Sequence, residues 1–212
     1  MAHYSQIYFD LDGTLCDSYP GIEKGFLNAL EQMGVGAVTE AELKKLIGTP
    51  LTTSLYTFFP NDDEKVAEGV ALFREYYRDK GLFESVLYPG VADMIPLLAT
   101  TSRLYLATNK PTLYARQMLE HHGLLSHFTD VRGVALEGPN TFTKSGAILD
   151  SWEGGKAIMV GDKPQDINEG KKAGIDSMGV LYGYGTEEEV HGATPTHVVV
   201  DIAEMTKILI AE

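Results

Sequence analysis

The sequence predicts an α/β fold in which helices cover a parallel sheet and an all-helical segment is inserted after the first strand. Three observations support this prediction. Gln6–Phe9 has the apolar character of a short strand, the block from about Tyr19 to Phe83 shows helical spacing, and strand and helix patterns alternate after Tyr88. Alternating strands and helices are typical of a parallel sheet, so the helical block is predicted to be a second, smaller domain.

The first strand ends in residues that favour a turn, Asp10-Leu-Asp-Gly13. In the helical block, Thr39 followed by Glu42 predicts a capping box that opens a helix at Glu40–Ile47. Apolar residues at helical spacing indicate further helices. These residues are Ile22, Phe26, Leu27 and Leu30 in one group, and Val66, Val70, Phe73 and Tyr77 in the other.

The remainder of the chain alternates between short apolar runs and helical patterns. A further helix is expected to begin at Thr186, where Glu187–Glu189 follow and acidic residues suit a helix N-terminus. We expect residues 1–16 and 87–212 to form the α/β core and residues 17–86 to form the inserted helical domain. The predicted strands are Leu104–Ala107, Val131–Val134, Ala157–Val160, Ser177–Leu181 and His197–Val200, and the predicted helices are Leu113–His122, Ser145–Trp152, Asp166–Ala173 and Ile202–Ile210.

The charge of the chain argues against nucleic acid and membranes as partners. Its 17 Lys and Arg face 30 Asp and Glu, and the formal net charge of −13 repels polyanions and anionic lipid surfaces. An anionic substrate would therefore need a metal ion or local cations at its binding site.

The cysteine content and the N-terminus indicate a cytoplasmic protein. Cys16 is the single cysteine, so the chain cannot form an internal disulfide, which favours a reducing compartment. Met1–Gln6 contains no basic segment followed by an apolar run, as a secretory signal would. The sequence also contains no run of about 18 apolar residues of the kind that a membrane helix needs.

Carboxylates follow two of the predicted strands. Asp10 and Asp12 come after the first strand, and Asp162 and Asp166 come after Ala157–Val160. In an open parallel sheet, ligands bind beyond the carboxyl ends of the strands. Several carboxylates in one cleft repel one another unless a cation lies among them, and an all-oxygen ligand set favours Mg²⁺. The sequence therefore predicts a magnesium site at this edge of the sheet.

The tetrapeptide that begins at Asp10 is also typical of a turn in which Asp caps the next segment. By itself it does not separate a turn from a metal site. Other polar residues at matching places favour the site, because Thr108-Asn-Lys110 ends one predicted strand, Lys144 opens a helix, and Gly161 and Asp162 end another strand.

The combination resembles the haloacid dehalogenase superfamily of aspartyl-phosphate hydrolases. Ile7–Leu15 matches the first motif of this superfamily, Leu106–Lys110 the second, Lys144 the third and Val160–Asp166 the fourth. The resemblance covers essentially the whole chain, because the helical insertion lies where one branch of the superfamily carries a four-helix cap. It implies a Rossmann-like, haloacid dehalogenase-like core with an inserted α-helical cap domain.

The resemblance also implies a role for each matching residue. Asp10 would attack phosphorus and form an aspartyl-phosphate. Asp12 would protonate the leaving oxygen and later activate water. Thr108 would hydrogen-bond the transferred phosphoryl group, and Lys144 would balance the charge of the nucleophile and the phosphate.

Mg²⁺ would be held by the carboxylates of Asp10 and Asp162 and the backbone carbonyl of Asp12. Asp166 would either orient this site or bind the ion directly. Substrate contacts are expected from Asn109 and Lys110 and from the segment that contains Gly48 and Thr49. Lys110 either competes with Lys144 for the charge-balancing role or is a solvated residue before a proline.

Function follows from the resemblance as an expectation. We expect a Mg²⁺-dependent phosphatase that hydrolyses a small, phosphoglycolate-like monoester, acting as a monomer or homodimer on a small phosphorylated metabolite. The alternatives are a nucleoside monophosphate or pyrophosphate hydrolase, a sugar phosphomutase, and a non-catalytic phosphate-binding or interaction protein. Asp12 separates the phosphatases from the true dehalogenases, which lack this aspartate. Tyr182–Gly185 either lines the cleft or forms a flexible turn.

Overall fold

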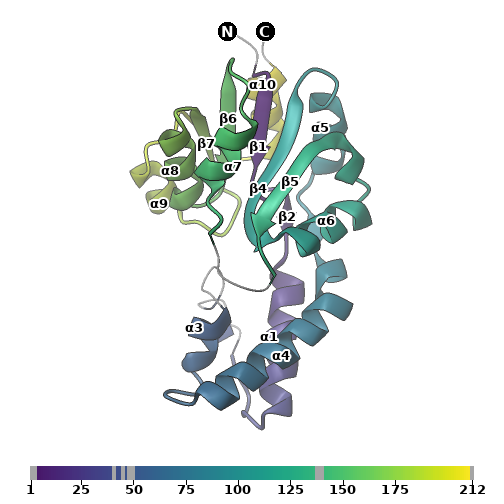
Figure 1. Ribbon diagram of the computed structural model, residues 1–212, viewed down its shortest axis with the longest axis vertical. Helices are drawn as coiled ribbons and strands as arrows, with labels where there is room; N and C mark the ends of the chain where they lie inside the picture. Colours follow the sequence, from purple (N-terminus) through teal and green to yellow (C-terminus); the bar gives the residue numbers. More distant parts are fainter. Residues whose placement is uncertain (1–3, 40–41, 44–45, 47–50, 137–140, 211–212) are drawn as a thin grey trace. The chain divides into compact units, whose positions relative to one another are not determined.

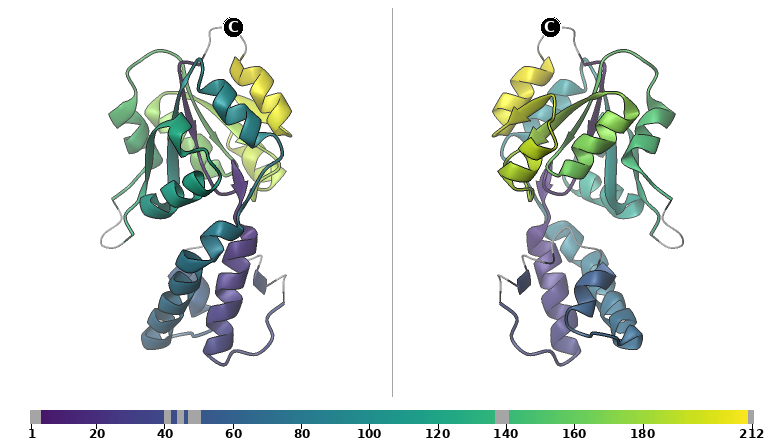
Figure 2. Two further views of the ribbon diagram at one scale, coloured as in Figure 1. Left: turned by 90° about the vertical axis from the view of Figure 1, so that its right-hand side faces the viewer. Right: turned by 90° about the vertical axis from the view of Figure 1, so that its left-hand side faces the viewer.

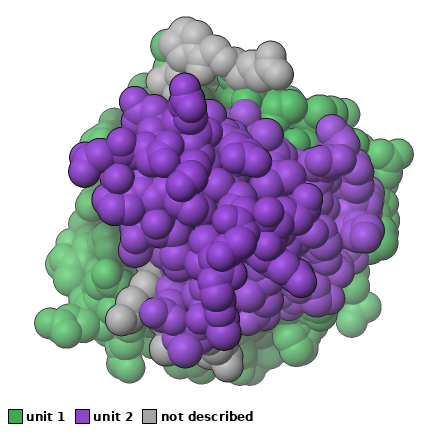
Figure 3. Space-filling view, turned by 90° about the horizontal axis from the view of Figure 1, so that it is seen from below, with its two compact units in different colours: residues 1–17, 86–212 green, residues 18–85 purple. Residues whose placement is uncertain are grey.

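The structure is a computed structural model that describes residues 4–39, 42–43, 46, 51–136 and 141–210. The chain forms two compact units, which Figure 3 draws in different colours. Residues 1–17 and 86–212 make the core unit, and residues 18–85 make the inserted unit. The expected role of the inserted unit as a cap stays a prediction.

The core unit contains a six-stranded sheet in the order β5-β4-β1-β6-β7-β8, and every pair of neighbouring strands is parallel (Figure 1). The α/β fold with a parallel, Rossmann-like sheet is thus confirmed. The strands are β1 (Gln6–Phe9), β4 (Arg103–Pro111), β5 (Phe128–Val134), β6 (Ala157–Gly161), β7 (Asp176–Val180) and β8 (His197–Val199).

Helices cover both faces of this sheet, as expected for a parallel sheet. Helix α5 packs against α10, and α7 packs against α8, on opposite faces in Figure 2. The predicted helices agree with the structure to within two residues at each end, whereas α5 was not predicted. The helices are α5 (Val91–Leu98), α6 (Thr112–His121), α7 (Lys144–Ser151), α8 (Pro164–Ala173), α9 (Glu187–Gly192) and α10 (Ile202–Ile210), with a short 3₁₀ turn η2 (Leu125–His127).

Strand β1 lies at the centre of the sheet because each of its side chains is either apolar or has its polar atoms hydrogen-bonded, so both faces of the strand can be buried. All four of its residues are buried. Tyr8 stacks on Tyr105 of β4 with ring centroids 4.8 Å apart, and burying one aromatic side chain of this kind contributes about 2–3 kcal/mol. Since β4 and β6 flank β1, the carboxyl ends of these three strands meet at one place.

A two-stranded ribbon that the sequence did not predict links the core unit to the insertion. Its strands, β2 (Cys16–Asp17) and β3 (Val86–Leu87), pair antiparallel, with Asp17 opposite Val86. The chain therefore leaves and re-enters the core unit along adjacent strands.

The inserted unit contains only helices among its described residues: α1 (Tyr19–Gln32), α3 (Leu51–Tyr56), α4 (Asp63–Asp79) and the 3₁₀ turn η1 (Gly81–Glu84). Phe26 of α1 packs against Phe73 of α4 with ring centroids 5.0 Å apart. The capping box is confirmed, because the backbone N–H of Glu42 donates to Thr39 Oγ1 and that of Thr39 donates to the Glu42 carboxylate. Most of the predicted helix Glu40–Ile47 lies outside the described residues. Within the described part of the chain, no helix is long and apolar enough to cross a membrane.

Candidate active site

Residues that follow β1 and β6 form the site, together with residues at the end of β4. The loop after β1 is a compact turn: the Asp10 N–H donates to the Val160 carbonyl at 2.9 Å, and the Gly13 N–H donates to the Cys16 carbonyl at 2.8 Å. Gly13 has a φ of +82°, a left-handed conformation that only glycine adopts without strain. The turn leaves the Asp10 side chain 12% exposed at the carboxyl end of the sheet.

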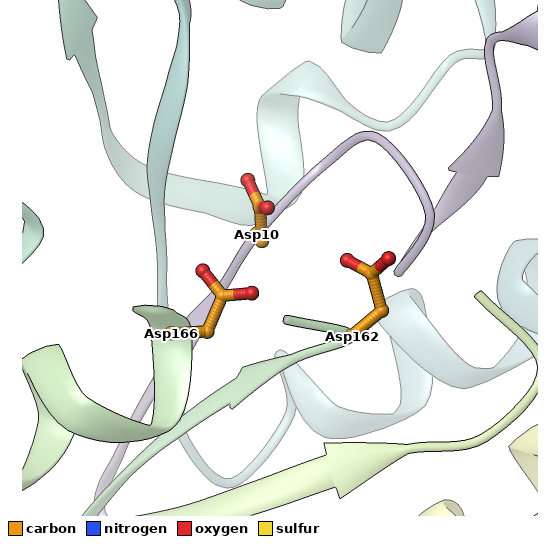
Figure 4. Close-up of side chains that lie close together, drawn as sticks. All are labelled: Asp10, Asp162 and Asp166. Atoms are coloured by element: carbon orange, nitrogen blue, oxygen red, sulfur yellow. The ribbon is translucent and has the colours of Figure 1, made fainter. Parts of the chain in front are cut away.

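Three buried carboxylates gather at this edge. Oxygen atoms of Asp10, Asp162 and Asp166 all lie within 4.8 Å of one another. Figure 4 shows the three side chains close together, contributed by the end of β1, the end of β6 and the first turn of α8. We call these three residues the carboxylate cluster.

Lys144, the first residue of α7, is the counter-ion of this cluster. Its Nζ lies 2.9 Å from Asp10 Oδ2 and also donates a hydrogen bond to Asp166 Oδ1, and its side chain is 1% exposed. Thr143 begins the helix by accepting the Gly146 N–H through Oγ1 at 3.0 Å. This cap directs Lys144 from the first turn of α7 into the cluster, where sequence reasoning expected it.

Burial shapes the protonation of the cluster. Desolvation raises the pKa of Asp10 to about 7, although the charge of Lys144 opposes the shift. Desolvation, together with the neighbouring charge of Asp166, raises the pKa of Asp162 to about 6. Burial alone would lower the pKa of Lys144, but the charges of Asp10 and Asp166 outweigh it and raise that pKa. Lys144 therefore stays protonated, while the crowded carboxylates resist full ionisation.

The cluster fits a hard divalent cation. Its donors are all carboxylate oxygens, the ligands that Mg²⁺ prefers. When all four groups are ionised, the three carboxylates and the Lys144 ammonium group carry a net charge of −2. One bound Mg²⁺ would neutralise this charge. The side chain of Asp12 is not part of the cluster, and the expected contact of its carbonyl with a metal stays a prediction.

Asp12 instead pairs with Lys110. The Lys110 Nζ donates to both carboxylate oxygens of Asp12, at 3.0 and 3.1 Å. The Lys110 side chain is 5% exposed, so the interpretation of Lys110 as a solvated residue is wrong. The two lysines contact different carboxylates, since Lys110 contacts Asp12 whereas Lys144 contacts Asp10 and Asp166.

The other residues of the second motif lie at the same edge. Thr108 is buried, and its Oγ1 accepts the Lys110 N–H at 3.2 Å. The Asn109 side chain is exposed and donates through Nδ2 to Gln165 Oε1 at 3.0 Å. Gly48 and Thr49, the other predicted substrate contacts, lie outside the described residues.

Sequence reasoning missed Glu169, which supports the start of α7. Its Oε2 accepts the Ser145 N–H at 2.9 Å and the Ser145 hydroxyl at 2.7 Å. Burial would raise the pKa of Glu169, but hydrogen bonds from Lys172 and Ser145 lower it to about 2. Glu169 lies three residues after Asp166, on the same face of α8, and this spacing was the available signal.

The segment Tyr182–Gly185 also proved to be more than a flexible turn. The Tyr184 N–H donates to Asp162 Oδ2 at 2.8 Å, and the Tyr182 hydroxyl donates to the Thr14 carbonyl at 2.8 Å. A Cβ on Gly183 would lie 2.3 Å from the Asp162 Cβ, so only glycine permits this approach. The segment therefore packs directly on Asp162.

Comparison with known proteins agrees with this geometry. The family described as "Haloacid dehalogenase-like hydrolase" matches residues 7–180. A 5'-nucleotidase of Pseudomonas aeruginosa is 34% identical, with 97% of this chain and 96% of the relative covered. A phosphoglycolate phosphatase of Vibrio parahaemolyticus is 30% identical, with 96% of this chain and 95% of the relative covered.

Among solved structures, a predicted phosphatase from Clostridium acetobutylicum superposes with a TM-score of 0.84 at 32% identity, and 99% of each chain is covered. The family match spans all four motifs, from Asp10 to Asp166, and the relatives span nearly the full chain. The chain belongs to the haloacid dehalogenase-like hydrolase family, and it groups with the phosphatases of that family, the phosphoric monoester hydrolases.

Proposed function

We propose that the protein is a Mg²⁺-dependent phosphatase that hydrolyses a small, phosphoglycolate-like monoester through a phosphorylated Asp10. The observation that carries this proposal is the position of the Asp10 carboxylate, 2.9 Å from the buried Lys144 Nζ and within the carboxylate cluster. A nucleophilic carboxylate, a fixed cation and a candidate metal site at one strand end are the parts that phosphoryl transfer requires.

In the first step, an oxygen of Asp10 attacks phosphorus and the bond between phosphorus and the ester oxygen breaks. Asp12, which must bind a proton before this step, gives that proton to the departing oxygen, so the alcohol leaves neutral. In the second step, Asp12 takes a proton from water, the water oxygen attacks phosphorus, and the bond from phosphorus to Asp10 breaks. Inorganic phosphate is released and both aspartates return to their starting forms.

The other residues act on charge and orientation. Lys144 balances the charge on Asp10 as negative oxygens approach, and Asp166 holds the Lys144 Nζ by a hydrogen bond. In this proposal the Thr108 hydroxyl and the backbone around Asn109 hydrogen-bond the phosphoryl oxygens. Mg²⁺, held by Asp10, Asp162 and the Asp12 carbonyl with Asp166 beside them, would supply positive charge where the phosphoryl oxygens gather.

A second candidate substrate class is the nucleoside 5'-monophosphates. The relative from Pseudomonas aeruginosa is named a 5'-nucleotidase and is 34% identical over nearly the whole chain, while the Vibrio relative is named a phosphoglycolate phosphatase at 30% identity. Both substrates are phosphate monoesters, so the same cluster would serve either one. We also propose a cytoplasmic location, because a chain whose single cysteine is Cys16 cannot form an internal disulfide.

The test is a phosphate-release screen with purified protein and Mg²⁺. Phosphoglycolate, nucleoside 5'-monophosphates, pyrophosphate and sugar phosphates are compared by kcat/KM. We expect turnover to require Mg²⁺, to stop in a chelator, and to fall by at least about 10³-fold in Asp10→Asn, which removes the nucleophile. Turnover that persists in Asp10→Asn or in the chelator contradicts the mechanism, and a preference for nucleotides selects the second substrate class.

A further inference from the structure

One residue of the core unit, Tyr184, contacts both the carboxylate cluster, through its backbone, and the strand along which the chain leaves that unit, through its side chain. Its backbone N–H donates to Asp162 Oδ2 at 2.8 Å, and its hydroxyl donates to Asp17 Oδ1 at 2.7 Å. Tyr184 and Asp17 are separated by 167 residues in sequence, so the tertiary fold alone brings them together.

Asp162 depends on this contact for its orientation. It is fully buried, and within the described part of the chain its other oxygen, Oδ1, accepts a longer hydrogen bond of 3.4 Å from Thr14 Oγ1. A Cβ on Gly185 would lie 2.0 Å from the Asp162 carbonyl oxygen, which shows how closely the backbone around Tyr184 approaches. The Tyr184 N–H is thus the shorter of two donors that set the direction of the Asp162 carboxylate.

Asp17 is connected through β2 both to the returning strand β3 and to the loop after β1. It is the last residue of β2 and of the first of the two segments that make the core unit, and it pairs with Val86 on the strand by which the chain returns. The same loop reaches back to the site, since Asp12 forms a β-bridge with Cys16. A displacement of Asp17 would therefore also shift the loop that carries Asp10 and Asp12.

We propose that Tyr184 is a positioning residue that couples the exit strand β2 to metal binding at Asp162. This inference rests on the proposed function only in taking Asp162 as a metal ligand. The hydroxyl holds the ring against Asp17, the held ring fixes the Tyr184 backbone, and the fixed N–H keeps the Asp162 carboxylate aimed at the cluster. Because coupling free energies are reciprocal, metal bound at Asp162 strengthens the bond between Tyr184 and Asp17 by the same amount.

The first test removes only the hydroxyl. Tyr184→Phe keeps the ring and the backbone N–H but loses the bond to Asp17, and Mg²⁺ binding to the metal-free protein is measured by titration calorimetry. We expect the dissociation constant to rise by about 3- to 10-fold, below the 10- to 100-fold typical when a direct partner of a metal ligand is lost. At saturating Mg²⁺, kcat should stay within about twofold, because the filled site restores the orientation of Asp162.

Tyr4→Phe is the matched control. The Tyr4 hydroxyl also donates to a carboxylate oxygen, Asp176 Oδ2 at 2.8 Å. Tyr4 precedes β1 and Asp176 begins β7. This pair therefore lies at the amino ends of the strands, away from the carboxylate cluster at their carboxyl ends. Removing it should lower the thermal midpoint to a similar extent and leave the Mg²⁺ dissociation constant unchanged. Equal effects of the two variants on Mg²⁺ binding would overturn the proposal.

The second test removes the acceptor of the same hydrogen bond, the Asp17 carboxylate, in place of the Tyr184 hydroxyl. Asp17→Ala should weaken Mg²⁺ binding by the same factor as Tyr184→Phe, and the double variant should bind no more weakly than either single variant, because the bond can be lost only once. If the two effects multiply, Tyr184 and Asp17 act independently and the coupling is refuted. If one variant does not fold, the other single variant still decides the question against Tyr4→Phe.

These measurements separate the inference from the proposed function. Wild-type protein that binds Mg²⁺ but releases no phosphate from any ester contradicts the phosphatase proposal and leaves the coupling measurable. Wild-type protein that releases phosphate, with a Tyr184→Phe variant of unchanged Mg²⁺ affinity, contradicts the coupling alone. Wild-type protein that binds no Mg²⁺ overturns the coupling, whatever its activity.

Discussion

Lys110 and Asp12 form an ion pair beside the carboxylate cluster without belonging to it. The Lys110 Nζ lies 3.0 Å from Asp12 Oδ1, whereas Lys144 contacts Asp10 and Asp166. The two lysines thus divide the charge of the site between the proposed nucleophile and the proposed acid–base residue. The division explains how two aspartates, two residues apart, can have different partners and different tasks.

Lys110→Met should lower kcat by about 10- to 100-fold with little change in KM, because Asp12 would lose the Lys110 ammonium group, whose two hydrogen bonds help to hold it in place for proton transfer. Steady-state kinetics of phosphate release from the best ester of the screen measures this effect. Lys24→Met is the control, since Lys24 also pairs with a carboxylate at 3.0 Å, in Glu84 of the inserted unit, and is exposed. Wild-type kcat in Lys110→Met would mean that Asp12 is oriented without Lys110.

The stability of the metal-free protein should fall as pH rises. Burial raises the pKa of Asp10 to about 7 and that of Asp162 to about 6, from an ordinary value of 3.8, so the folded form binds these protons more tightly than the unfolded chain. The resulting stability is fully present below about pH 4 and is lost as pH rises through 6 and 7.

Thermal melts in a chelator at pH 5 and pH 8 test this dependence. We expect the midpoint to be lower at pH 8 by roughly 5 °C or more, since 1 kcal/mol moves the midpoint of a chain of this size by about 2–4 °C. Mg²⁺ should remove most of the difference by stabilising the ionised carboxylates. Asp162→Asn should show a smaller difference between the two pH values, and an unchanged difference would speak against the role given to this carboxyl group.

Lys144→Met should destabilise the metal-free protein by about 3–5 kcal/mol, because it leaves buried carboxylates without their counter-ion. Urea unfolding measures the loss, and Mg²⁺ should recover part of it by taking over the charge. Lys172 pairs with Glu169 but its side chain is 65% exposed. Lys172→Met should therefore cost no more than about 1 kcal/mol. Losses of equal size would show that Lys144 is not the counter-ion of the cluster.

Gly183→Ala should weaken Mg²⁺ binding and destabilise the fold, because the new Cβ would lie 2.3 Å from both the Asp162 Cβ and the Gly13 carbonyl oxygen. Crowding of this kind typically costs about 1–3 kcal/mol. Gly192→Ala is the matched control, since nothing lies within 4 Å of a Cβ built there. Calorimetric Mg²⁺ titration of both variants should separate them, and identical affinities would indicate that the Tyr182–Gly185 segment does not orient Asp162.

Local patterns in the sequence were sufficient for the order of the elements. The apolar run Gln6–Phe9 and the helical spacing after Asp166 each depend on residues near one another in the chain, and both elements are found in the structure. The positions of Asp10, Asp162 and Lys144 at element ends were predictable for the same reason, since the carboxyl ends of parallel strands share one edge.

The sequence by itself determined which residues lie at this edge; the tertiary structure alone decided which of them are partners. Lys110 and Asp12 are 98 residues apart, and Tyr184 and Asp17 are 167 apart. Such pairs depend on strand order and on register, which shifts in the pairing of β4 with β5 between Ala107 and Pro111. Hydrophobic periodicity reports which face of an element is buried and carries no information about which distant element covers it.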